Sequence, residues 1–290
     1  MWTENAEATT CNGHFLRVIS QESQQERNKM IRINQIKLDI GTDEKILNSK
    51  IQKLLRLKNS SFTYSIVKKS IDARKKEHIM YIYSVDVKVD GIDETALVRK
   101  LNNKDIIINK NIKYVFPQIK DTHKNKKIAI IGSGPAGLFC GLLLARAGFK
   151  PVIYERGGNV HERTGIVNAF FETGVLDTET NIQFGEGGAG TFSDGKLNTL
   201  VKDKENRCKK VFQIFVENGA DENILYVSKP HIGTDKLRNV IINMRNKIIK
   251  MGGCFRYNTT LTDLIIENNK LTKIVVNEKE EIDCDNLILA

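Results

Sequence analysis

Apolar and polar residues alternate at the start of the folded chain in a way that predicts a strand and then a helix. The stretch MIRINQIKLDI, residues 30–40, alternates as a half-buried strand does. Thr42 or Asp43 is then placed to cap a helix that runs to Leu57. The apolar face of this helix would be made by Ile46, Ile51, Leu54 and Leu55.

Three further strand signals and one short helix complete this part of the pattern. The runs SFTYSIVKKSIDA and HIMYIYSVDVKV are rich in β-branched and aromatic residues, which favour strands. DETALVRKLNN predicts a short helix with Asp93 near its start, and DIIINKNIKYVFP predicts the last strand. The order βαββαβ predicts an α+β domain of the ferredoxin-like kind.

The pattern changes in the carboxy-terminal part. A continuous apolar run at Ile128–Ile131 is typical of a central parallel strand. A helix of small and apolar residues is predicted from Leu138 to Ala147, and PVIYE predicts a second strand. An amphipathic helix beginning at Thr234, a strand, a small β-meander and a final apolar strand follow. This pattern predicts an α/β domain of the Rossmann-like kind.

These patterns divide the chain into four segments. Residues 1–29 are polar and lack periodicity, so we expect a disordered extension. Residues 30–117 form the expected ferredoxin-like domain, and the polar, basic residues 118–127 are expected to link it to the next domain. Residues 128–290 form the expected Rossmann-like, dinucleotide-binding domain.

A glycine motif follows the first parallel strand. It has the form G-x-G-x-x-G and lies between a predicted strand and a predicted helix. In such a turn the first glycine permits the tight bend, the second lets a pyrophosphate approach the backbone, and the third lets the helix pack closely on the strand. The start of the helix offers free N–H groups to the phosphates. The expected phosphate-binding turn comprises Gly132, Ser133, Gly134, Pro135, Ala136 and Gly137.

An acidic residue stands where the second strand ends. Glu155 comes 18 residues after Gly137, where a carboxylate accepts hydrogen bonds from ribose hydroxyls, which favours FAD or NAD over NADP. Arg156 follows it and is expected to contribute to the same site. A glycine turn in an α/β unit that binds no nucleotide is the alternative, and the strand, helix and acid together argue against it.

The stretch NIQFGEGGAGTFSDGKLNT, residues 181–199, is too rich in glycine for the interior of a helix or strand. In its position after the second strand it resembles the glycine-rich loop that flavoproteins with this motif place against the flavin side of FAD, and the resemblance implies the same placement here. Its backbone N–H groups are expected to form an anion nest on phosphate or to approach the flavin. Asp194 is expected to hold the turn. The expected cofactor contacts are Gly187, Gly188, Gly190, Thr191 and Ser193.

Two polar residues are candidates for catalysis. Lys196, in the glycine-rich loop, is placed to hold negative charge on a reduced flavin. His231, in KPHIGTD before a predicted helix, is the best acid–base candidate. The alternatives are a solvated lysine and a turn histidine that bonds to backbone. His161, Glu162 and Arg163 are expected to tie the loop region together rather than to act in catalysis.

Cysteine usage and hydropathy exclude several classes of protein. The five cysteines are scattered and form no CxxC pair, which argues against a zinc site, a disulfide framework and a redox disulfide, so no metal ligand is predicted. No apolar run approaches the ~18 residues that a membrane span needs, and the first residues lack the features of a signal peptide. We therefore expect a cytoplasmic protein with no membrane partner.

The net charge of +10 is concentrated in one part of the chain. Residues 30–127 carry 22 Lys and Arg against 11 Asp and Glu, a net charge of +11, whereas residues 128–290 carry 20 of each. A basic domain can attract nucleic acid, so RNA is left open as a partner. A solvated, lysine-rich surface is the simpler explanation, because no RNP motif or GXXG loop supports RNA binding.

The glycine-rich loop also carries a family resemblance. FGEGGAGTFSDGKL, together with GSGPAGL and KPHIGTDKLR, resembles the bacterial FAD-dependent dehydrogenase family of NAD(P)/FAD-dependent oxidoreductases, flavoproteins with two dinucleotide-binding domains and unassigned substrates. The resemblance extends from Met30 to Ala290. It implies that FAD binds through the two glycine segments, with the backbone of Leu261 at the adenine. It also makes NAD(P)H a candidate electron donor.

The resemblance further implies that the chain is an amino-terminal fragment, because family members are substantially longer. We therefore expect the 290-residue chain to retain FAD weakly or not at all. Three functions stay open. The first is an FAD-dependent oxidoreductase that transfers hydride to or from an unknown substrate. The second is a flavoprotein that acts on RNA and docks it on the basic domain. The third, for the fragment alone, is a non-catalytic nucleotide-binding module.

Overall fold

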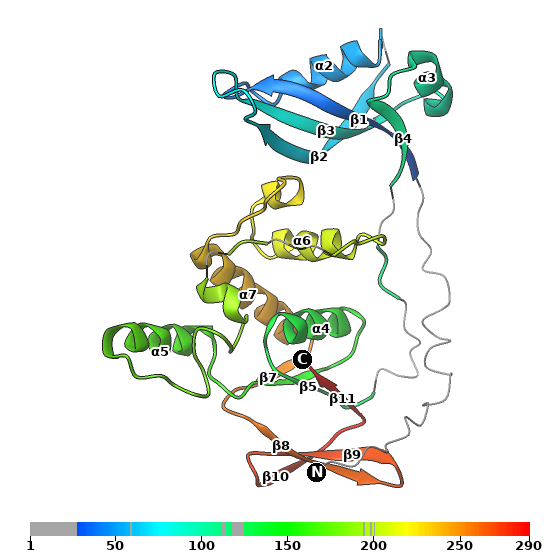
Figure 1. The fold of residues 1–290 in the computed structure, drawn as a ribbon. Coiled ribbons are helices and arrows are strands. Elements are labelled where there is room, and N and C mark those ends of the chain that lie inside the picture. Colours follow the sequence, from blue (N-terminus) through cyan, green and yellow to red (C-terminus); the bar gives the residue numbers. More distant parts are fainter. Residues whose placement is uncertain are drawn as a thin grey trace, which may run out of the picture.

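The computed structural model describes residues 28–58, 60–111, 114–117, 125–193, 195–197, 199 and 201–290. Residues 1–27 of the predicted extension and residues 118–124 of the predicted linker lie outside this set. The described residues form an antiparallel four-stranded sheet, at the top of Figure 1, and a parallel four-stranded sheet with a three-stranded meander below it.

The amino-terminal unit has the predicted βαββαβ order. Its strands pair in the order β2-β3-β1-β4, and all neighbours are antiparallel. Apolar residues of both helices join one core cluster with the strands, so both helices cover the same face of the sheet. The structure therefore confirms the ferredoxin-like fold. The elements are β1 (Asn28–Asp39), α2 (Ile46–Leu54), β2 (Phe62–Asp72), β3 (Met80–Val89), α3 (Glu94–Leu101) and β4 (Ile106–Asn111).

A bulge explains the broken alternation of β1. Ile31, Ile33, Ile36 and Leu38 are all buried, although the spacing between Ile33 and Ile36 is three residues. The pairing with β3 shifts between these two residues, and Gln35 has a left-handed φ of 58°. The extra residue returns the following side chains to the core face.

The first helix begins later than the sequence predicts. α2 starts at Ile46, and its N-cap residue makes no side-chain cap. Thr42 and Asp43 are therefore not its caps, and that prediction is wrong. The Asp43 carboxylate instead accepts a hydrogen bond from the Lys45 N–H at 2.9 Å within the preceding turn. In α3 the carboxylate of Asp93 does accept two N–H groups of the first turn, as expected.

The carboxy-terminal part has a parallel sheet in the order β11-β5-β6-β7. Helices α4 and α7 lie on one side of this sheet, and the meander β8–β10 lies on the other (Figure 1). The Rossmann-like fold is thus confirmed. The elements are β5 (Ile128–Ile131), α4 (Pro135–Arg146), β6 (Val152–Tyr154), α5 (Val160–Thr173), η2 (Ala189–Phe192), α6 (Arg207–Glu217), η3 (Glu222–Leu225), α7 (Thr234–Lys250), β7 (Cys254–Arg256), β8 (Leu261–Glu267), β9 (Lys270–Val276), β10 (Glu280–Asp283) and β11 (Asn286–Leu289).

The central strand β5 is buried on both of its faces. Ile128 and Ile130 belong to the cluster formed with α4 and α7. Ala129, which points the opposite way, belongs to the cluster under the meander. Two covered faces account for the continuous apolar run in the sequence. Within the residues that the structure describes, no helix is long and apolar enough to cross a membrane.

Candidate functional site

The glycine motif forms a tight turn between β5 and α4. Gly132 has a φ of 97°, and its N–H donates to the carbonyl of Tyr154 at 2.7 Å. A Cβ on Gly137 would lie 2.0 Å from the carbonyl oxygen of Gly132, so the helix and the turn are in close contact there. A Cβ on Gly134 would meet no atom within 4 Å. The first and third glycines are needed for the fold, and the second borders open space.

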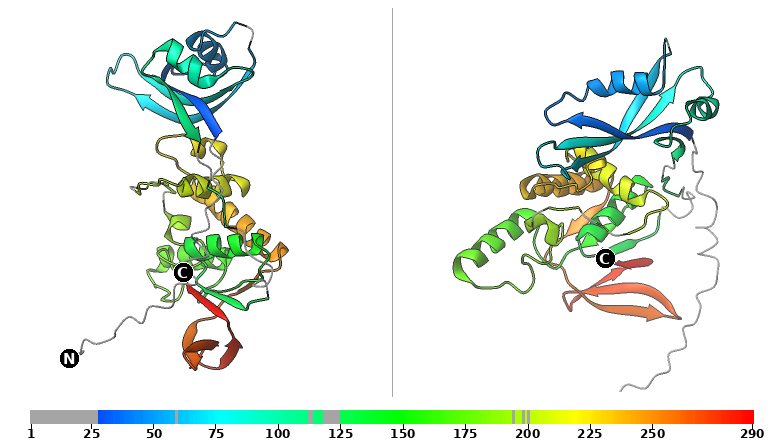
Figure 2. Two further views of the ribbon diagram at one scale, coloured as in Figure 1. Left: turned by 90° about the vertical axis from the view of Figure 1, so that its right-hand side faces the viewer. Right: turned by 45° about the horizontal axis from the view of Figure 1, so that its top comes forward.

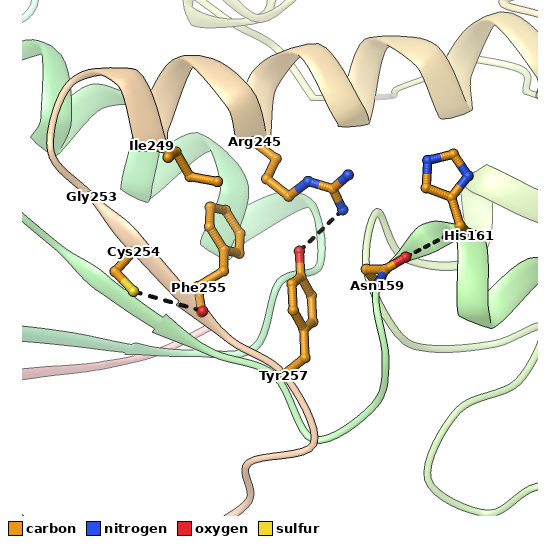
Figure 3. Close-up of a pocket in the computed structure, with 8 residues that line it drawn as sticks. All are labelled: Asn159, His161, Arg245, Ile249, Gly253, Cys254, Phe255 and Tyr257. Carbon is orange, nitrogen blue, oxygen red and sulfur yellow. Dashed lines mark hydrogen bonds between the residues drawn. The ribbon is translucent and has the colours of Figure 1, made fainter.

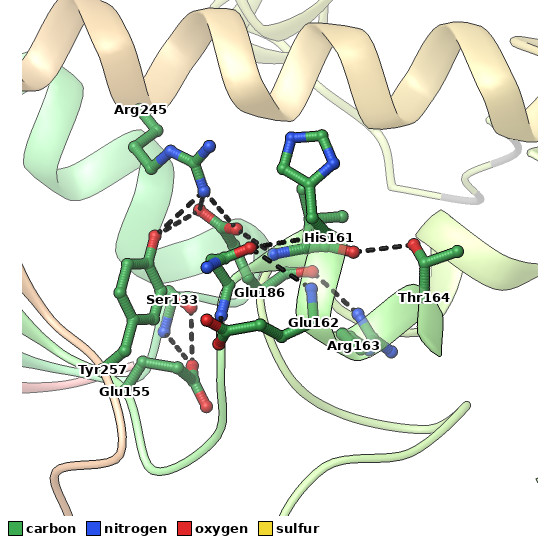
Figure 4. A network of polar contacts seen from close by, with 11 residues as sticks. Ser133, Glu155, His161, Glu162, Arg163, Thr164, Glu186, Arg245 and Tyr257 are labelled. Carbon is green, nitrogen blue, oxygen red and sulfur yellow. Dashed lines mark hydrogen bonds and ion pairs between the residues drawn. The ribbon is translucent and has the colours of Figure 1, made fainter. Parts of the chain in front are cut away.

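Glu155 is buried at the end of β6 and braces this turn. One carboxylate oxygen accepts hydrogen bonds from the Ser133 N–H at 2.8 Å and the Ser133 hydroxyl at 2.6 Å (Figure 4). The other oxygen accepts from the Gly157 N–H at 3.0 Å. A carboxylate has about four acceptor positions. One of them is left for a further donor such as a ribose hydroxyl.

The glycine-rich loop lies directly against the glycine motif. The Gly187 N–H donates to the Ser133 carbonyl at 2.9 Å. A Cβ on Gly188 would lie 2.6 Å from Cδ of Pro135. The structure thus brings together two segments that the sequence analysis assigned to one cofactor. The predicted anion nest is wrong for three of its amides, because the N–H groups of Gly187, Gly188 and Thr191 donate to carbonyls of the protein.

Arg163 of α5 contacts the glycine-rich loop and is fully buried. Its guanidinium donates to the carbonyls of Asn181, Ile182, Glu186 and Gly188 at 2.7–3.0 Å. Burial lowers the pKa of Arg163 to about 10, against the opposing effect of two nearby glutamates. The prediction that this segment ties the loop together is therefore confirmed for this residue.

The neighbouring residues of α5 stabilise the helix start. The Asn159 carboxamide accepts the N–H of His161 at 2.9 Å, and the Glu162 carboxylate accepts the N–H of Asn159 at 3.1 Å. Together with the Glu162 N–H, which donates back to Asn159, these bonds form a capping box. Glu162 therefore also has a structural role, as expected.

Glu186 is a buried carboxylate inside the glycine-rich loop that the sequence analysis did not select. It is fully inaccessible. It accepts hydrogen bonds from the Val160 N–H at 2.6 Å, the Tyr257 hydroxyl at 2.7 Å and the Arg245 guanidinium at 2.9 Å (Figure 4). The loop is thus attached to α5, α7 and the segment after β7 at one point. The sequence feature that could have indicated this role was a charged residue between glycines.

Replacing Tyr257 with phenylalanine is expected to lower the free energy of unfolding by about 1 kcal/mol, because Glu186 loses one of its donors. Burial, followed by the Glu186 carboxylate, raises the pKa of Tyr257 above its ordinary value of 10.0. The stability that the neutral Tyr257 phenol contributes is therefore fully present below about pH 10, and it is lost as the pH rises further. Urea unfolding at about pH 7 and pH 11 should show a smaller alkaline loss in the variant. Equal losses in both proteins would contradict this assignment.

Lys196 and His231 lie opposite each other in an isolated antiparallel bridge. The Leu197 N–H donates to the carbonyl of Pro230, and the Ile232 N–H donates to the carbonyl of Gly195, at 3.0 and 2.9 Å. Directly opposed residues of such a bridge project to the same face. Both side chains are exposed. The structure therefore brings the two candidate catalytic residues together.

The remaining predicted residues lie in three different segments. The Arg156 guanidinium forms an ion pair with Glu179 at 2.7 Å. Leu261 begins β8, and Ser193 is exposed at the end of η2. Asp194 lies outside the described residues.

The residues present fit the diphosphate end and the loop side of FAD. The N-cap of α4 is Gly134, which has no side chain to cap the amides of the first turn. The open side of Gly134 gives room for a pyrophosphate. The Thr191 hydroxyl is buried in the glycine-rich loop without a hydrogen-bond partner, as a group that awaits a ligand would be.

A separate pocket lies beside this site. Its volume is about 310 Å³, and it opens between α5, α7 and β7 (Figure 3). Arg245 and Tyr257, which donate to Glu186, line this pocket, whereas no residue of the glycine motif does. Its lining consists of Asn159, His161, Arg245, Ile249, Gly253, Cys254, Phe255 and Tyr257.

The described residues hold no disulfide or metal cluster. Cys140, Cys208, Cys254 and Cys284 are free thiols, and burial raises the pKa of the Cys140 thiol. No group of three or more His, Cys, Asp or Glu side chains is placed to hold a metal ion in the part of the chain that the structure covers.

Comparisons with known proteins give two family matches. Residues 30–88 match a domain of unknown function (DUF8436). Residues 126–290, more than half of the chain, match the pyridine nucleotide-disulphide oxidoreductase family. The second match covers both glycine segments, Glu155 and the whole parallel sheet.

Individual proteins are also similar to parts of this chain. A protein of Clostridium beijerinckii, described as uncharacterised, is 42% identical over 262 residues, which are 90% of this chain and 48% of that protein. The chain thus spans about half the length of this relative. A thioredoxin reductase of Pneumocystis jirovecii is 36% identical over 80 residues, 28% of this chain and 21% of that protein. The solved structure of THI4 from Thermovibrio ammonificans shares 16% identity, with a TM-score of 0.36 and 58% of each chain covered.

The prediction of a flavin- and nicotinamide-dependent oxidoreductase family is confirmed by the match over residues 126–290. The glycine motif, the carboxylate after β6 and the parallel sheet are the features on which that prediction depended. The chain belongs to the pyridine nucleotide-disulphide oxidoreductase family.

Proposed function

We propose that the protein is an FAD-dependent oxidoreductase that transfers hydride between a small-molecule substrate and a second carrier, with NAD(P)H as the expected donor. The observation that supports this most directly is the contact between the two glycine segments. The Gly187 N–H reaches the Ser133 carbonyl, so the loop and the phosphate-binding turn border one site. FAD, when bound, supplies the hydride-accepting ring.

The chain's own residues have separate tasks in this proposal. The first turn of α4 binds the diphosphate through its backbone N–H groups. Glu155 accepts hydrogen bonds from the ribose. Lys196 holds negative charge near the flavin, and His231 moves a proton to or from the substrate. The bridge between the last two residues sets their spacing.

The cysteines in the part of the chain that the structure describes form no redox disulfide. The four cysteines that the structure describes are unpaired and come from α4, α6, β7 and the turn before β11. We therefore propose that electrons pass from the flavin to a soluble acceptor rather than to a protein disulfide.

The RNA alternative gains less support. Base stacking on a ferredoxin-like sheet uses aromatic residues on its open face. Here Phe62, Tyr64, Tyr81 and Tyr83 belong to the core cluster formed with α2 and α3, on the covered face. The charge of this domain is then a property of its solvated surface.

The test is reconstitution followed by reduction. The purified protein is titrated with FAD, and the bound flavin is mixed without oxygen with NADH or NADPH. Bleaching of the flavin absorbance by either nucleotide is expected. No FAD binding by the correctly folded full-length protein would contradict the proposal, because weak or absent binding by the 290-residue chain alone is already expected.

Replacing Lys196 with methionine is expected to slow flavin reduction about tenfold or more, while FAD affinity changes little, because the side chain is exposed and contributes charge rather than packing. Stopped-flow absorbance measures the rate. Lys202, an exposed lysine six residues further on, provides the matched control as Lys202→Met. Equal rates in both variants would exclude Lys196 from the reaction.

A further inference from the structure

The segment of residues 226–232 is hydrogen-bonded on both of its sides, and we call it the strap. On one side it meets the edge strand β2 of the ferredoxin-like domain. The Lys69 N–H donates to the Tyr226 carbonyl at 2.7 Å, and the Ser228 N–H donates to the Lys69 carbonyl at 3.0 Å. Val227 and Lys69 thus form a parallel bridge. The strap extends the amino-terminal sheet beyond its edge.

On its other side the strap meets the end of the glycine-rich loop. Its residue His231 is bridged to Lys196. The approach is so close that a Cβ on Gly195 would lie 1.7 Å from the Ile232 carbonyl oxygen. Gly195 also has a φ of 68°, which favours glycine. Only a glycine at this position lets the loop and the strap pair.

Few residues separate the two contacts. Between Ser228 and His231 lie Lys229 and Pro230, and proline has a fixed φ. Pro230 and Ile232 are buried, so the strap is held against the core. Figures 1 and 2 show η3, which leads into the strap, between the ferredoxin-like domain and the rest of the molecule. A displacement of β2 is therefore passed on to the bridge.

The side chain of Lys69 makes separate contacts within the ferredoxin-like domain. The Lys69 ammonium bonds to the Glu44 carboxylate at 2.7 Å and lies 4.4 Å from the ring centre of Tyr81. The Tyr83 hydroxyl donates to the same carboxylate at 2.9 Å. The side chain of Lys69 thus packs within the ferredoxin-like domain, whereas its main chain pairs with the strap.

We propose that the ferredoxin-like domain is a positioning module for the catalytic pair, and that the strap holds Lys196 and His231 in register through the main chain of Lys69. This inference rests on the proposed function for the roles of the pair. The coupling itself is a property of the backbone and does not depend on those roles. Lys69, Val227 and Ser228 are positioning residues, since they act through the bridge.

Three variants separate the main chain of Lys69 from its side chain. Lys69→Pro removes the N–H that Tyr226 accepts, whereas Lys69→Ala removes the side chain and keeps the N–H. Ile71→Pro is the matched control, because residue 71 lies two positions along the same edge with the same outward orientation. Proline is tolerated at edge positions whose N–H faces solvent. Ser228→Pro removes both the N–H and the hydroxyl that donate to the Lys69 carbonyl from the strap side.

The first readout is amide hydrogen exchange at Leu197 and Ile232, whose N–H groups form the bridge. Lys69→Pro and Ser228→Pro are expected to speed exchange there about tenfold or more, while Lys69→Ala and Ile71→Pro leave it within about twofold. The second readout is flavin reduction. We expect the same two variants to reduce flavin more slowly with unchanged FAD affinity.

Unchanged exchange at both amides in folded Lys69→Pro and Ser228→Pro proteins would overturn the inference, and so would equal acceleration in Ile71→Pro. Circular dichroism establishes that each variant is folded, and Ser228→Pro leaves the ferredoxin-like domain untouched. If exchange rises as expected but the wild-type flavin is not reduced by any nucleotide, the coupling stands and the proposed function fails. The two outcomes are thus distinguishable.

Discussion

Replacing Arg163 with methionine is expected to lower the free energy of unfolding by about 3–5 kcal/mol and to abolish FAD binding. The side chain is fully buried, and it donates to four carbonyls of the glycine-rich loop. Methionine fills a similar volume but offers no donor, so these carbonyls lose their partner. Two buried acids, Glu155 and Glu186, also lose a neighbouring positive charge. The loop would then separate from the phosphate-binding turn.

Urea unfolding measures the first effect, and FAD titration measures the second. For stability, the matched control is Arg156→Met, because Arg156 is half exposed and its ion pair with Glu179 lies at the surface. An exposed pair contributes about 0–1 kcal/mol. If the two variants are equally stable, the loop is held by other contacts. A stable Arg163→Met protein that binds FAD normally would show that the loop is not part of the site.

The sequence predicted the parts of the site that depend on neighbouring residues. The local sequence from Gly132 to Gly137 indicates one backbone conformation, because a left-handed turn and a close helix approach both require glycine. The helix that follows the motif and the acid Glu155 after β6 belong to the same strand–helix–strand unit. The local sequence therefore predicts them too. The order of elements in the ferredoxin-like domain was also readable, because its strands and helices have distinct periodicities.

The parts that were missed depend on contacts between distant segments. Glu186 and Tyr257 are 71 residues apart, and the bond between them follows from how α7 and β7 lie on the sheet. The sequence did not show that Lys69 would pair with residues 226–228, since an edge strand accepts many partners. The start of α2 was missed because turn residues before Ile46 use the same polar side chains as a cap.

Gly134→Ala and Gly137→Ala are expected to separate cofactor binding from folding. A Cβ on Gly134 meets nothing within 4 Å, and the residue has a φ of −63°, which alanine adopts readily. The variant should therefore fold with a stability within about 1 kcal/mol of the wild type. Its methyl group would enter the space that the pyrophosphate needs, so FAD affinity should fall at least about tenfold.

Gly137→Ala is expected to impair folding itself, and not only FAD binding. Its Cβ would lie 2.0 Å from the Gly132 carbonyl oxygen, and neither backbone can yield without moving α4 away from β5. We expect a loss of about 1–3 kcal/mol in the free energy of unfolding, together with loss of FAD binding. Thermal unfolding and flavin fluorescence titration on both variants test this contrast. Both changes add one methyl group, at positions three residues apart in the sequence. Normal FAD binding by a folded Gly134→Ala protein would place the pyrophosphate away from this turn and would contradict the proposed cofactor site.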